Sequence, residues 1–282
     1  MHDIPVMERK MSAVAFLPMY AVRGTHDHTD TLWSCCRDSI RRNGIEAPDQ
    51  VAHFESRLEG WLHPDLILGQ TCGLPYITQL SDRVALIGTP DYAVDGCPRG
   101  FYHSTLVVSS ADKRTRLSDF SGCTLAINGK DSQSGYGAIM FASAPFAQRG
   151  RFFRRAVHTR SHAKSMQLVA NGLADIAAID SVTWRMSRQF DPDTSSLKSI
   201  GTTEPTPGLP FIAAGGKPAE RLLDAVRDGV AALPETTRKA FGLLDVLPLP
   251  RKQYEVILSN LAQAEAVHTL PDLEEIQGAL PL

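Results

Sequence analysis

The stretch NGKDSQSGYG at residues 128–137 carries residue types that suit the binding of an anion. It follows an apolar segment typical of a strand, and a helix is expected to open at about Tyr136. Backbone N–H groups in such a loop can converge on one point, and the helix N-terminus adds partial positive charge, so the loop suits a phosphate or phosphonate oxyanion. Ser132 and Ser134 would add hydroxyl donors. The alternative, which the sequence leaves open, is that Asp131 or Ser132 only caps the helix.

A second candidate site combines a helix start with a carboxylate at the end of a strand. Ser161 can cap a helix whose first turn presents His162, and Asp180 stands where the apolar segment at 176–179 stops. A carboxylate at this place can hold a ligand ammonium group or accept a hydrogen bond from a hydroxyl. The alternative interpretation is that Asp180 caps the helix that begins near Val182.

Two other groups of reactive residue types are assigned no chemistry. Cys72 lies in the turn QTCG at 70–73, but no protease or thiol-enzyme signature surrounds it. The stretch HDHTD at 26–30 has the residue types of a metal site without further ligands, so N-capping of a helix by Asp27 or Asp30 is the favoured interpretation. We therefore predict no catalytic residue, no metal site and no cofactor.

Composition excludes several classes of partner. The 282 residues carry a formal net charge of -2 and 43% hydrophobic residues, so a large core can form but no basic excess exists to bind nucleic acid. No apolar run approaches the roughly 18 residues of a membrane-spanning helix, so no membrane insertion is expected. The first 20 residues do not read as a secretory signal. The compartment therefore stays open: either a signal has been trimmed or the protein works in the cytoplasm.

The residues that could hold a ligand must be positioned by alternating strands and helices. Strands are expected at 13–17, 66–68, 84–87, 105–108, 124–127, 155–159, 176–179 and 211–214, and helices at 29–43, 163–171, 219–232, 235–243 and 251–267. This alternation predicts an α/β fold with largely parallel sheets. Because ligands of open α/β sheets lie beyond the carboxyl ends of the strands, the polar strand-end loops should share one rim.

Two segments are predicted to cross between lobes. Residues 101–109 lead out of the first α/β block, and residues 201–211 lead back with prolines at 205, 207 and 210 that favour an extended path. Lobe one would then comprise residues 1–104 plus 209–282, with a helical C-terminal cap. Lobe two would comprise residues 105–208.

Taken together, several segments resemble the phosphate, phosphite and phosphonate type of ABC-transporter substrate-binding proteins, the PhnD-like family. The resemblance runs in the family's order over roughly residues 12–215. The matching pieces are LPMY at 17–20, DLILGQTCG at 65–73, Tyr92, GC at 96–97, YHS at 102–104, Asn128, DSQSG at 131–135, SH at 161–162 and ADIAAID at 174–180.

The resemblance implies a two-lobed type II periplasmic-binding-protein fold with two crossing segments as a hinge and a small anionic ligand in the cleft. Hinge closure would tighten binding. It further implies a periplasmic location and an ABC-transporter permease as a partner. The implied anion cradle is Ser132, Gln133, Ser134 and Gly135, and the other implied contacts are Tyr20, Thr71, Tyr92, His162 and Asp180.

Other functions remain as alternatives at this point. An enzyme on the same fold would use His162, Asp180 or Cys72 as acid, base or nucleophile, on a small phosphorylated or heterocyclic metabolite. A cytoplasmic sensor would present its closed form to a partner protein, and an exposed apolar patch would favour it. Tyr20, Tyr92 and Trp184 could also stack on a heteroaromatic ligand, although core packing is the favoured interpretation for each.

Overall fold

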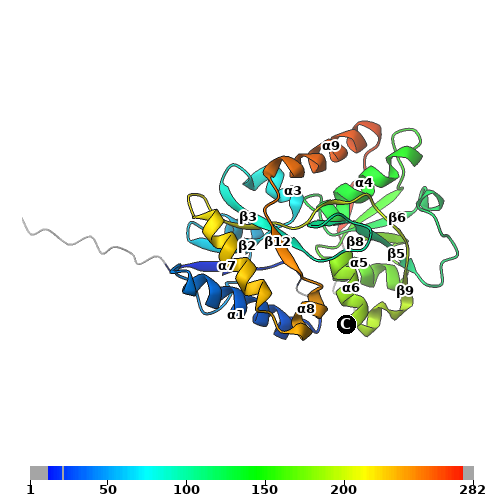
Figure 1. Ribbon diagram of the computed structural model, residues 1–282. Coiled ribbons are helices and arrows are strands. Elements are labelled where there is room, and N and C mark those ends of the chain that lie inside the picture. The colour runs from blue at the N-terminus through cyan, green and yellow to red at the C-terminus, as the bar shows by residue number, and fades with distance from the viewer. Residues whose placement is uncertain (1–11, 21, 276–282) are drawn as a thin grey trace, which may run out of the picture.

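Two mixed sheets joined by a short ribbon form the framework of the protein (Figure 1). The computed structural model describes residues 12–20 and 22–275. The first sheet has the strand order β1-β2-β11-β3-β12, and the second has the order β13-β7-β6-β8-β5-β9. Helices cover both sheets, which gives two α/β lobes.

The first sheet is built around a strand that is buried along its whole length. Its strands are β1 (Val14–Phe16), β2 (Leu66–Gln70), β3 (Val84–Asp91), β11 (Phe211–Ala214) and β12 (Asp245–Leu247). All five residues of β2 are buried, as expected for a short apolar run in the interior of a sheet. Strand β11 runs antiparallel to both of its neighbours, β2 and β3.

The second sheet has a parallel half and an antiparallel half. Its strands are β5 (Ser104–Ser109), β6 (Thr124–Ile127), β7 (Arg155–His158), β8 (Ile176–Asp180), β9 (Leu197–Thr202) and β13 (Leu273–Glu275). Strands β13, β7, β6 and β8 are parallel, whereas β5 is antiparallel to β8 and β9. The prediction of largely parallel sheets was therefore wrong, because the segments that cross between the lobes enter each sheet in the opposite direction.

The predicted crossing segments meet in a two-stranded antiparallel ribbon. Strand β4 (Phe101–Tyr102) pairs with β10 (Thr206–Pro207), with Tyr102 opposite Thr206. The returning segment is thus extended at β10, as its prolines favoured, and it lies beside β4 of the first crossing segment. This arrangement confirms the predicted hinge of two crossing segments.

The helices follow the predicted positions closely, with several additional short turns. Around the first sheet lie α1 (His26–Arg42), α2 (Arg57–Trp61), α3 (Gly73–Pro75), η1 (Tyr76–Leu80), α7 (Ala219–Ala231) and α8 (Glu235–Phe241). Around the second lie η2 (Leu117–Phe120), η3 (Gln133–Gly137), α4 (Ala138–Ser143), η4 (Ala144–Phe146), α5 (His162–Ala170), α6 (Ser181–Phe190) and η5 (Pro192–Ser196). Helix α9 (Arg251–Val267) lies along both lobes (Figure 1).

One capping prediction was wrong at the start of α1. Asp27 and Asp30 both lie inside this helix, whose N-cap is Thr25 without a side-chain capping bond. The helix begins at His26 rather than at the predicted residue 29, so Asp27 and Asp30 lie too far inside it to cap its start.

The C-terminal segment differs from its predicted place as a cap on lobe one. Helix α9 has 17 residues, which span about 25 Å, and apolar side chains lie along its whole length. Tyr254 and Ile257 pack into the core of the first sheet, whereas Ala264 packs into the core of the second. Strand β13 then pairs with β7 in the second sheet. The lobe boundaries themselves stay a prediction.

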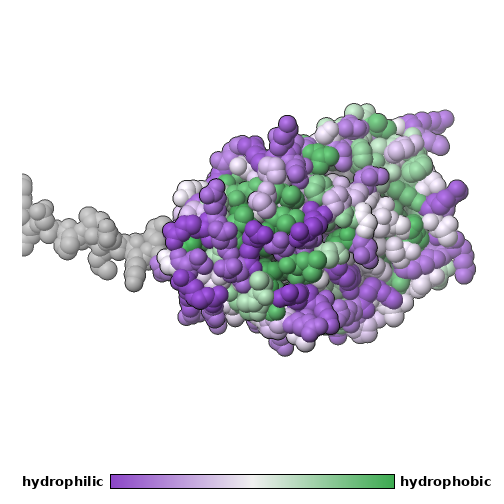
Figure 2. All heavy atoms as spheres, in the orientation of Figure 1, coloured by the Kyte–Doolittle hydropathy of each residue, from purple (hydrophilic) through white to green (hydrophobic). Residues whose placement is uncertain are grey.

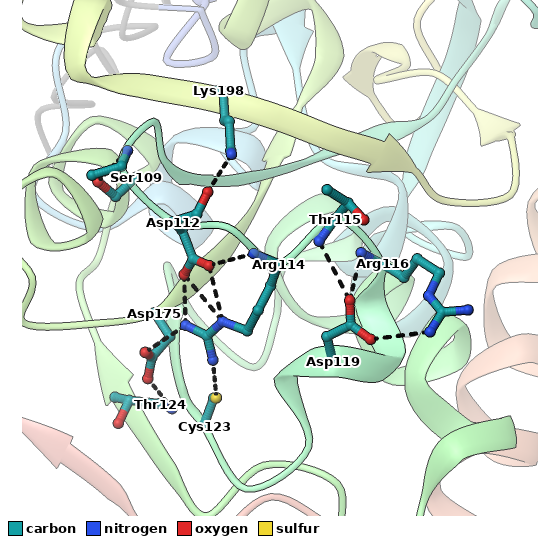
Figure 3. Close-up of polar contacts among 11 residues, drawn as sticks. Ser109, Asp112, Arg114, Thr115, Arg116, Asp119, Cys123, Thr124, Asp175 and Lys198 are labelled. Atoms are coloured by element: carbon teal, nitrogen blue, oxygen red, sulfur yellow. Dashed lines mark hydrogen bonds and ion pairs between the residues drawn. The ribbon is translucent and has the colours of Figure 1, made fainter.

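A dense polar cluster fixes the loop between β5 and β6 (Figure 3). The Arg114 guanidinium donates to Asp112 at 2.6 Å, to Asp175 at 3.1 Å and to the Cys123 sulfur at 2.7 Å. Asp175 in turn accepts from the backbone N–H of Thr124 at 2.8 Å. These contacts join the loop after β5, the start of β6 and the residue before β8. Within the described residues, no helix is both long and apolar enough to cross a membrane.

Candidate ligand-binding site

Loops at the strand ends of both lobes enclose a cavity of about 260 Å3. Five of the nine predicted contacts line it, together with Cys72 of the first lobe. The five are Tyr20, Ser132, Ser134, His162 and Asp180. Because Cys72 after the end of β2, Ser134 of η3, His162 of α5 and Asp180 of β8 all reach this one space, the shared rim predicted from the strand ends is present.

The loop before η3 forms one wall of the cavity. The Ser132 hydroxyl accepts from the backbone N–H of Gly135 at 3.0 Å, so Ser132 caps the helix and lines the cavity at the same time. The capping interpretation is therefore confirmed for Ser132 but not for Asp131, and the anion-binding role of Ser132 stays a prediction. A Cβ at Gly135 would lie 1.8 Å from Asn128 Oδ1, so the loop packs too closely there for any side chain.

Ser134 and His162 form a hydrogen-bonded pair inside the cavity. Ser134 Oγ lies 2.9 Å from His162 Nε2, and the Ser134 carbonyl accepts from Ser104 Oγ at 2.9 Å. Ser161 caps α5 through the backbone N–H of Lys164, as predicted, and this places His162 at the first turn. The Nδ1 atom of His162 has no hydrogen-bond partner among the described residues.

The environment of His162 keeps its imidazole neutral. Burial lowers the pKa of His162 to about 4, and the positive charge of Arg57 acts in the same direction. The ring can therefore donate or accept one hydrogen bond through Nδ1, according to its tautomer, without carrying a charge. His162 thus offers an anion a neutral hydrogen-bonding group rather than a fixed positive charge.

Asp180 faces the cavity at the carboxyl end of β8. Its Oδ1 accepts from the backbone N–H groups of Val182 at 2.8 Å and Thr183 at 2.9 Å, so it caps α6 as the alternative interpretation proposed. Its Oδ2 accepts from the Tyr20 hydroxyl at 3.4 Å. Burial raises the pKa of Asp180 to about 6, although these hydrogen bonds act against the shift. One oxygen thus caps the helix while the other stays at the cavity.

Tyr20 reaches the cavity from a strained backbone. Its φ is 59°, in the left-handed region that a bulky residue seldom adopts. Its ring packs edge-on against Tyr92 with the centroids 5.0 Å apart, and the Tyr92 hydroxyl accepts from Gln70 Nε2 at 3.1 Å. Strained backbone conformations of this kind cluster at functional sites. Here the conformation points the Tyr20 hydroxyl toward Asp180.

The remaining predicted contacts support the cavity without lining it: Thr71, Tyr92, Gln133 and Gly135. The Thr71 hydroxyl donates to the Cys72 carbonyl at 3.3 Å, and the Gln133 backbone N–H donates to the Cys72 sulfur at 3.3 Å. The second bond joins the two lobes directly. Burial raises the pKa of Cys72, so its thiol stays protonated and is a poor nucleophile.

Sequence reasoning missed several residues that line the cavity. Arg23, Arg57 and Trp61 line it from lobe one, and Asp191 lines it from lobe two. Arg23 Nη1 lies 3.6 Å from Asp191 and 3.2 Å from Asp193, so an ion pair crosses the rim. No motif marks these residues, because they come from loops and helix ends of different lobes. Trp184 is absent from the cavity lining, so the idea that it stacks on a ligand has no support.

No metal site accompanies the cavity in the part of the chain that the structure describes. Among those residues, no group of three or more His, Cys, Asp or Glu side chains could hold a metal ion. The residues around the cavity accordingly offer hydroxyl, imidazole, carboxylate and backbone N–H groups. This set suits the reversible binding of a small polar molecule that carries both acceptors and a donor.

A second contact between the lobes involves Arg185 of α6. Its guanidinium donates to the Tyr92 carbonyl at 3.0 Å through both Nη atoms, and also to the Phe241 carbonyl at the end of α8. Val182 and Met186 of the same helix are fully buried in the core of the first lobe. Helix α6 therefore connects the second sheet to the first lobe on one side of the cavity.

We expect Arg185→Met to lower both stability and ligand affinity. The change keeps an apolar stem but removes hydrogen bonds from a charged donor, each of which contributes about 1.5–3 kcal/mol. Urea unfolding and calorimetric titration would measure the two effects. Arg188→Met is the matched control, because Arg188 lies on the same helix and bonds within lobe two to Thr194. Equal ligand affinity in both variants would show that Arg185 does not hold the lobes closed.

Comparison with known proteins identifies a protein family that matches this chain. A family model described as "ABC transporter, phosphonate, periplasmic substrate-binding protein" matches residues 68–250. No curated protein sequence matches the chain. Many solved structures match it at low sequence identity.

Three of these structures illustrate the likeness in fold. XAC2383 from Xanthomonas citri, bound to ATP, is 17% identical with a TM-score of 0.64, covering 91% of this chain and 99% of that one. PhnD1 from Prochlorococcus marinus, in complex with methylphosphonate, is 16% identical with a TM-score of 0.67, covering 88% and 96%. A binding protein component of an ABC phosphonate transporter from Pseudomonas aeruginosa is 13% identical with a TM-score of 0.57, covering 90% and 96%. The predicted two-lobed type II periplasmic-binding-protein fold is thereby confirmed.

Proposed function

Because this chain belongs to the family of periplasmic substrate-binding proteins of phosphonate ABC transporters, we propose that its cavity binds a small phosphonate-like or phosphate-like anion. Membership confirms the family resemblance seen in the sequence, and it makes the chain a solute-binding protein rather than an enzyme. The identity of the bound anion and the residues that hold it are the parts that we propose.

The observation that carries this proposal is the convergence of neutral donors at one end of the cavity. Ser132 and Ser134 begin η3, and Ser134 is paired with His162, whose Nδ1 is without a partner in the described chain. The N–H groups of Gln133 and Gly135 already donate to Cys72 Sγ and Ser132 Oγ. The groups left for an anion are therefore the two serine hydroxyls and His162 Nδ1, at the positive end of the helix dipole. We propose that these groups hold the oxyanion, while Gln133 and Gly135 shape the loop and Thr71 and Tyr92 support it from lobe one.

Asp180 adds a requirement on the ligand. Its Oδ2 can only accept hydrogen bonds once the carboxyl group is ionised, and Tyr20 supplies a long one at 3.4 Å. A ligand whose nearest atoms were all acceptors would therefore be repelled. We propose that the bound molecule presents a donor to Asp180, either an ammonium or hydroxyl group on its substituent or the proton of a monoanionic phosphonate.

The compartment and the partner follow the family in our proposal. The family is periplasmic and serves ABC transporters. We propose that the protein delivers its ligand outside the cytoplasm to an ABC-transporter permease. The start of the chain, on which the prediction about a signal depended, lies largely outside the described residues. Cell fractionation of the full-length protein would test the proposed compartment.

A ligand screen tests the proposed function. Native mass spectrometry would first reveal any retained small anion, and thermal shifts would then be compared for phosphate, methylphosphonate, 2-aminoethylphosphonate and sulfate. A ligand at 100 times its Kd stabilises the folded form by about 2.7 kcal/mol, which raises Tm by roughly 5–10 °C in a protein of this size. We expect such a shift for at least one phosphonate or phosphate, and none for sulfate.

The matched variants make the screen specific to the cavity. Ser134→Ala removes one donor of the proposed cradle, whereas Ser199→Ala removes an exposed hydroxyl on β9. The first should lose most of the ligand-induced shift and the second should keep it. A shift that both variants retain would place the anion elsewhere, and no shift with any of the four compounds would count against the proposal.

A further inference from the structure

A second and larger hollow lies on lobe two, away from the ligand cavity. It has a volume of about 760 Å3 and is bounded by the α4–η4 segment, the last turns of α9 and the strands β5 and β9. Most of its lining is apolar. The polar part of the lining includes Glu204, which follows β9. The apolar residues are Leu106, Leu117, Phe141, Ala142, Ala144, Pro145, Phe146, Ile200, Ala264 and Val267. We call this hollow the α4–α9 groove.

The groove exists because one face of the second sheet is only partly covered. Helices α4 and α9 pack on that face over a core that includes Leu106 and Ala264. Ile200, on the edge strand β9, is only half-buried although it packs against the same core. The helical layer therefore stops short of the edge of the sheet, and a place for one more element remains beside α4.

Large apolar side chains are exposed along this groove. Phe146 is 43% exposed and Val267 is 52% exposed, and both belong to its lining. Figure 2 shows a hydrophobic area over this end of α4 and α9, at the upper right, with hydrophilic residues beside it. An exposed apolar surface of this kind on a folded protein commonly marks a site of interaction.

Positive charge lies at one end of the groove. A turn closed by a bridge between Gln148 and Arg151 follows η4, and its Gly150 carbonyl accepts from the Thr269 N–H at 3.1 Å. This contact places the turn beside the end of α9, where Val267 lies. Arg149 and Arg151 are both exposed, and the described residues provide no ion-pair partner for either.

Two neighbouring arginines do have acidic partners. Residues 148–160 contain five arginines and no acidic residue. Arg155 pairs with Glu274 at 2.5 Å, and Arg160 pairs with Glu275 at 3.3 Å. The described residues thus supply acidic partners for Arg155 and Arg160 beside β13, whereas none of them pairs with Arg149, Arg151 or Arg154.

We propose that the α4–α9 groove docks an amphipathic helix of another protein, with acidic residues of that helix facing Arg149 and Arg151. A helix fits because the missing element belongs to a layer of helices on a sheet. An amphipathic helix places its apolar residues three and four positions apart on one face, which matches a groove lined by apolar side chains. Acidic residues beside that face would complement the two arginines.

A second copy of this chain offers no such helix in its described part. Its two long amphipathic helices outside the groove, α1 and α7, pack their apolar faces against each other in the core of the first lobe. The buried residues of α1 include Trp33 and Ile40, and those of α7 include Leu222 and Val226. Our proposal therefore places a helix of a different protein in the groove.

The test uses the full chain and two designed helical peptides. Both peptides carry leucine along one face, and they differ only in flanking residues that are glutamate in one and lysine in the other. Fluorescence anisotropy should show that the glutamate peptide binds at least about tenfold more tightly, with an advantage that shrinks as salt is raised. Phe146→Glu should weaken its binding about tenfold or more, because Phe146 is exposed and its replacement leaves the core intact.

Charge reversal separates the proposal from nonspecific apolar binding. The double variant Arg149→Glu with Arg151→Glu should prefer the lysine peptide, while the anion-induced shift in Tm stays as in the unaltered protein. The matched control Arg83→Glu changes an exposed arginine on lobe one, outside the groove lining, and should leave the peptide preference unchanged. Equal binding of both peptides, or binding that Phe146→Glu does not weaken, would overturn the proposal. A concentration-dependent dimer that Phe146→Glu dissociates would overturn it too, since the groove would then be an interface between copies.

Discussion

Replacement of Gly135 by alanine is expected to abolish measurable binding of the anion. The new Cβ would lie 1.8 Å from Asn128 Oδ1 and 2.7 Å from its Cγ, so either the Asn128 side chain or the whole loop must move. The loop carries Ser132 and Ser134, and both of the proposed hydroxyl donors would shift with it. We expect affinity to fall at least about 100-fold and the free energy of unfolding to fall by about 1–3 kcal/mol, as overpacking usually costs.

A second substitution separates the clash from the loss of a glycine. Asn128→Ala removes the side chain that the new Cβ would meet, and φ of Gly135 lies outside the left-handed region, so alanine is otherwise tolerated there. The double variant should regain most of the lost free energy of unfolding in urea titrations. If Gly135→Ala alone binds methylphosphonate or phosphate as the unaltered protein does, the loop before η3 is not the anion cradle.

The fold was accessible from the sequence because its signals are local. Strands β6 and β11 lie at the predicted residues, and so does α9. In each case an apolar pattern is bounded by residues that stop the element. The short strands β12 and β13 were missed, because three residues without a clear apolar alternation carry no local signal. Each of them forms by pairing with a longer strand, β12 with β3 and β13 with β7.

Site residues could be predicted from the sequence only where they stand at the end of a strand or the start of a helix. Ser132, His162 and Asp180 reach the cavity because each stands at a strand end or a helix start. The backbone of Tyr20 turns through a positive φ, which no sequence pattern predicted. Arg23 and Arg57 come from segments whose position depends on packing between the lobes. Tyr92 and Gln133 were predicted as contacts, and the structure places them behind the cavity lining, a position that the residue type alone does not reveal.

Asp180→Asn is expected to change which anions the protein prefers. The asparagine Oδ1 can still accept from the N–H groups of Val182 and Thr183, so the cap of α6 is retained. At pH 7.5 the ionised Asp180 should favour 2-aminoethylphosphonate through its ammonium group. Loss of the Asp180 charge should weaken the binding of 2-aminoethylphosphonate about 100-fold, since breaking a buried charge pair costs about 2–5 kcal/mol. Methylphosphonate should bind the variant at least as well, because its charge is no longer opposed.

The matched control lies at the mouth of the same cavity. Asp191→Asn alters a carboxylate that pairs with the exposed Arg23 across the rim. It should change the affinity of both ligands little, since exposed ion pairs contribute about 0–1 kcal/mol. Calorimetric titration of both variants with both ligands completes the comparison. A parallel loss of both ligands in Asp180→Asn would assign Asp180 a structural role only.

Stability against pH tests Asp180 without any ligand. Burial raises the pKa of Asp180 from 3.8 to about 6, so the folded protein holds this proton over a range where the unfolded chain has released it. Its contribution to stability is therefore full below pH 3.8 and is lost as pH rises to 6, by about 3 kcal/mol in all. The asparagine variant carries no such proton, so it should gain stability relative to the unaltered protein between pH 4 and pH 7. A difference in the free energy of unfolding that stays constant with pH would mean that Asp180 is already ionised at pH 4, and the cavity would then hold a charge that its surroundings stabilise.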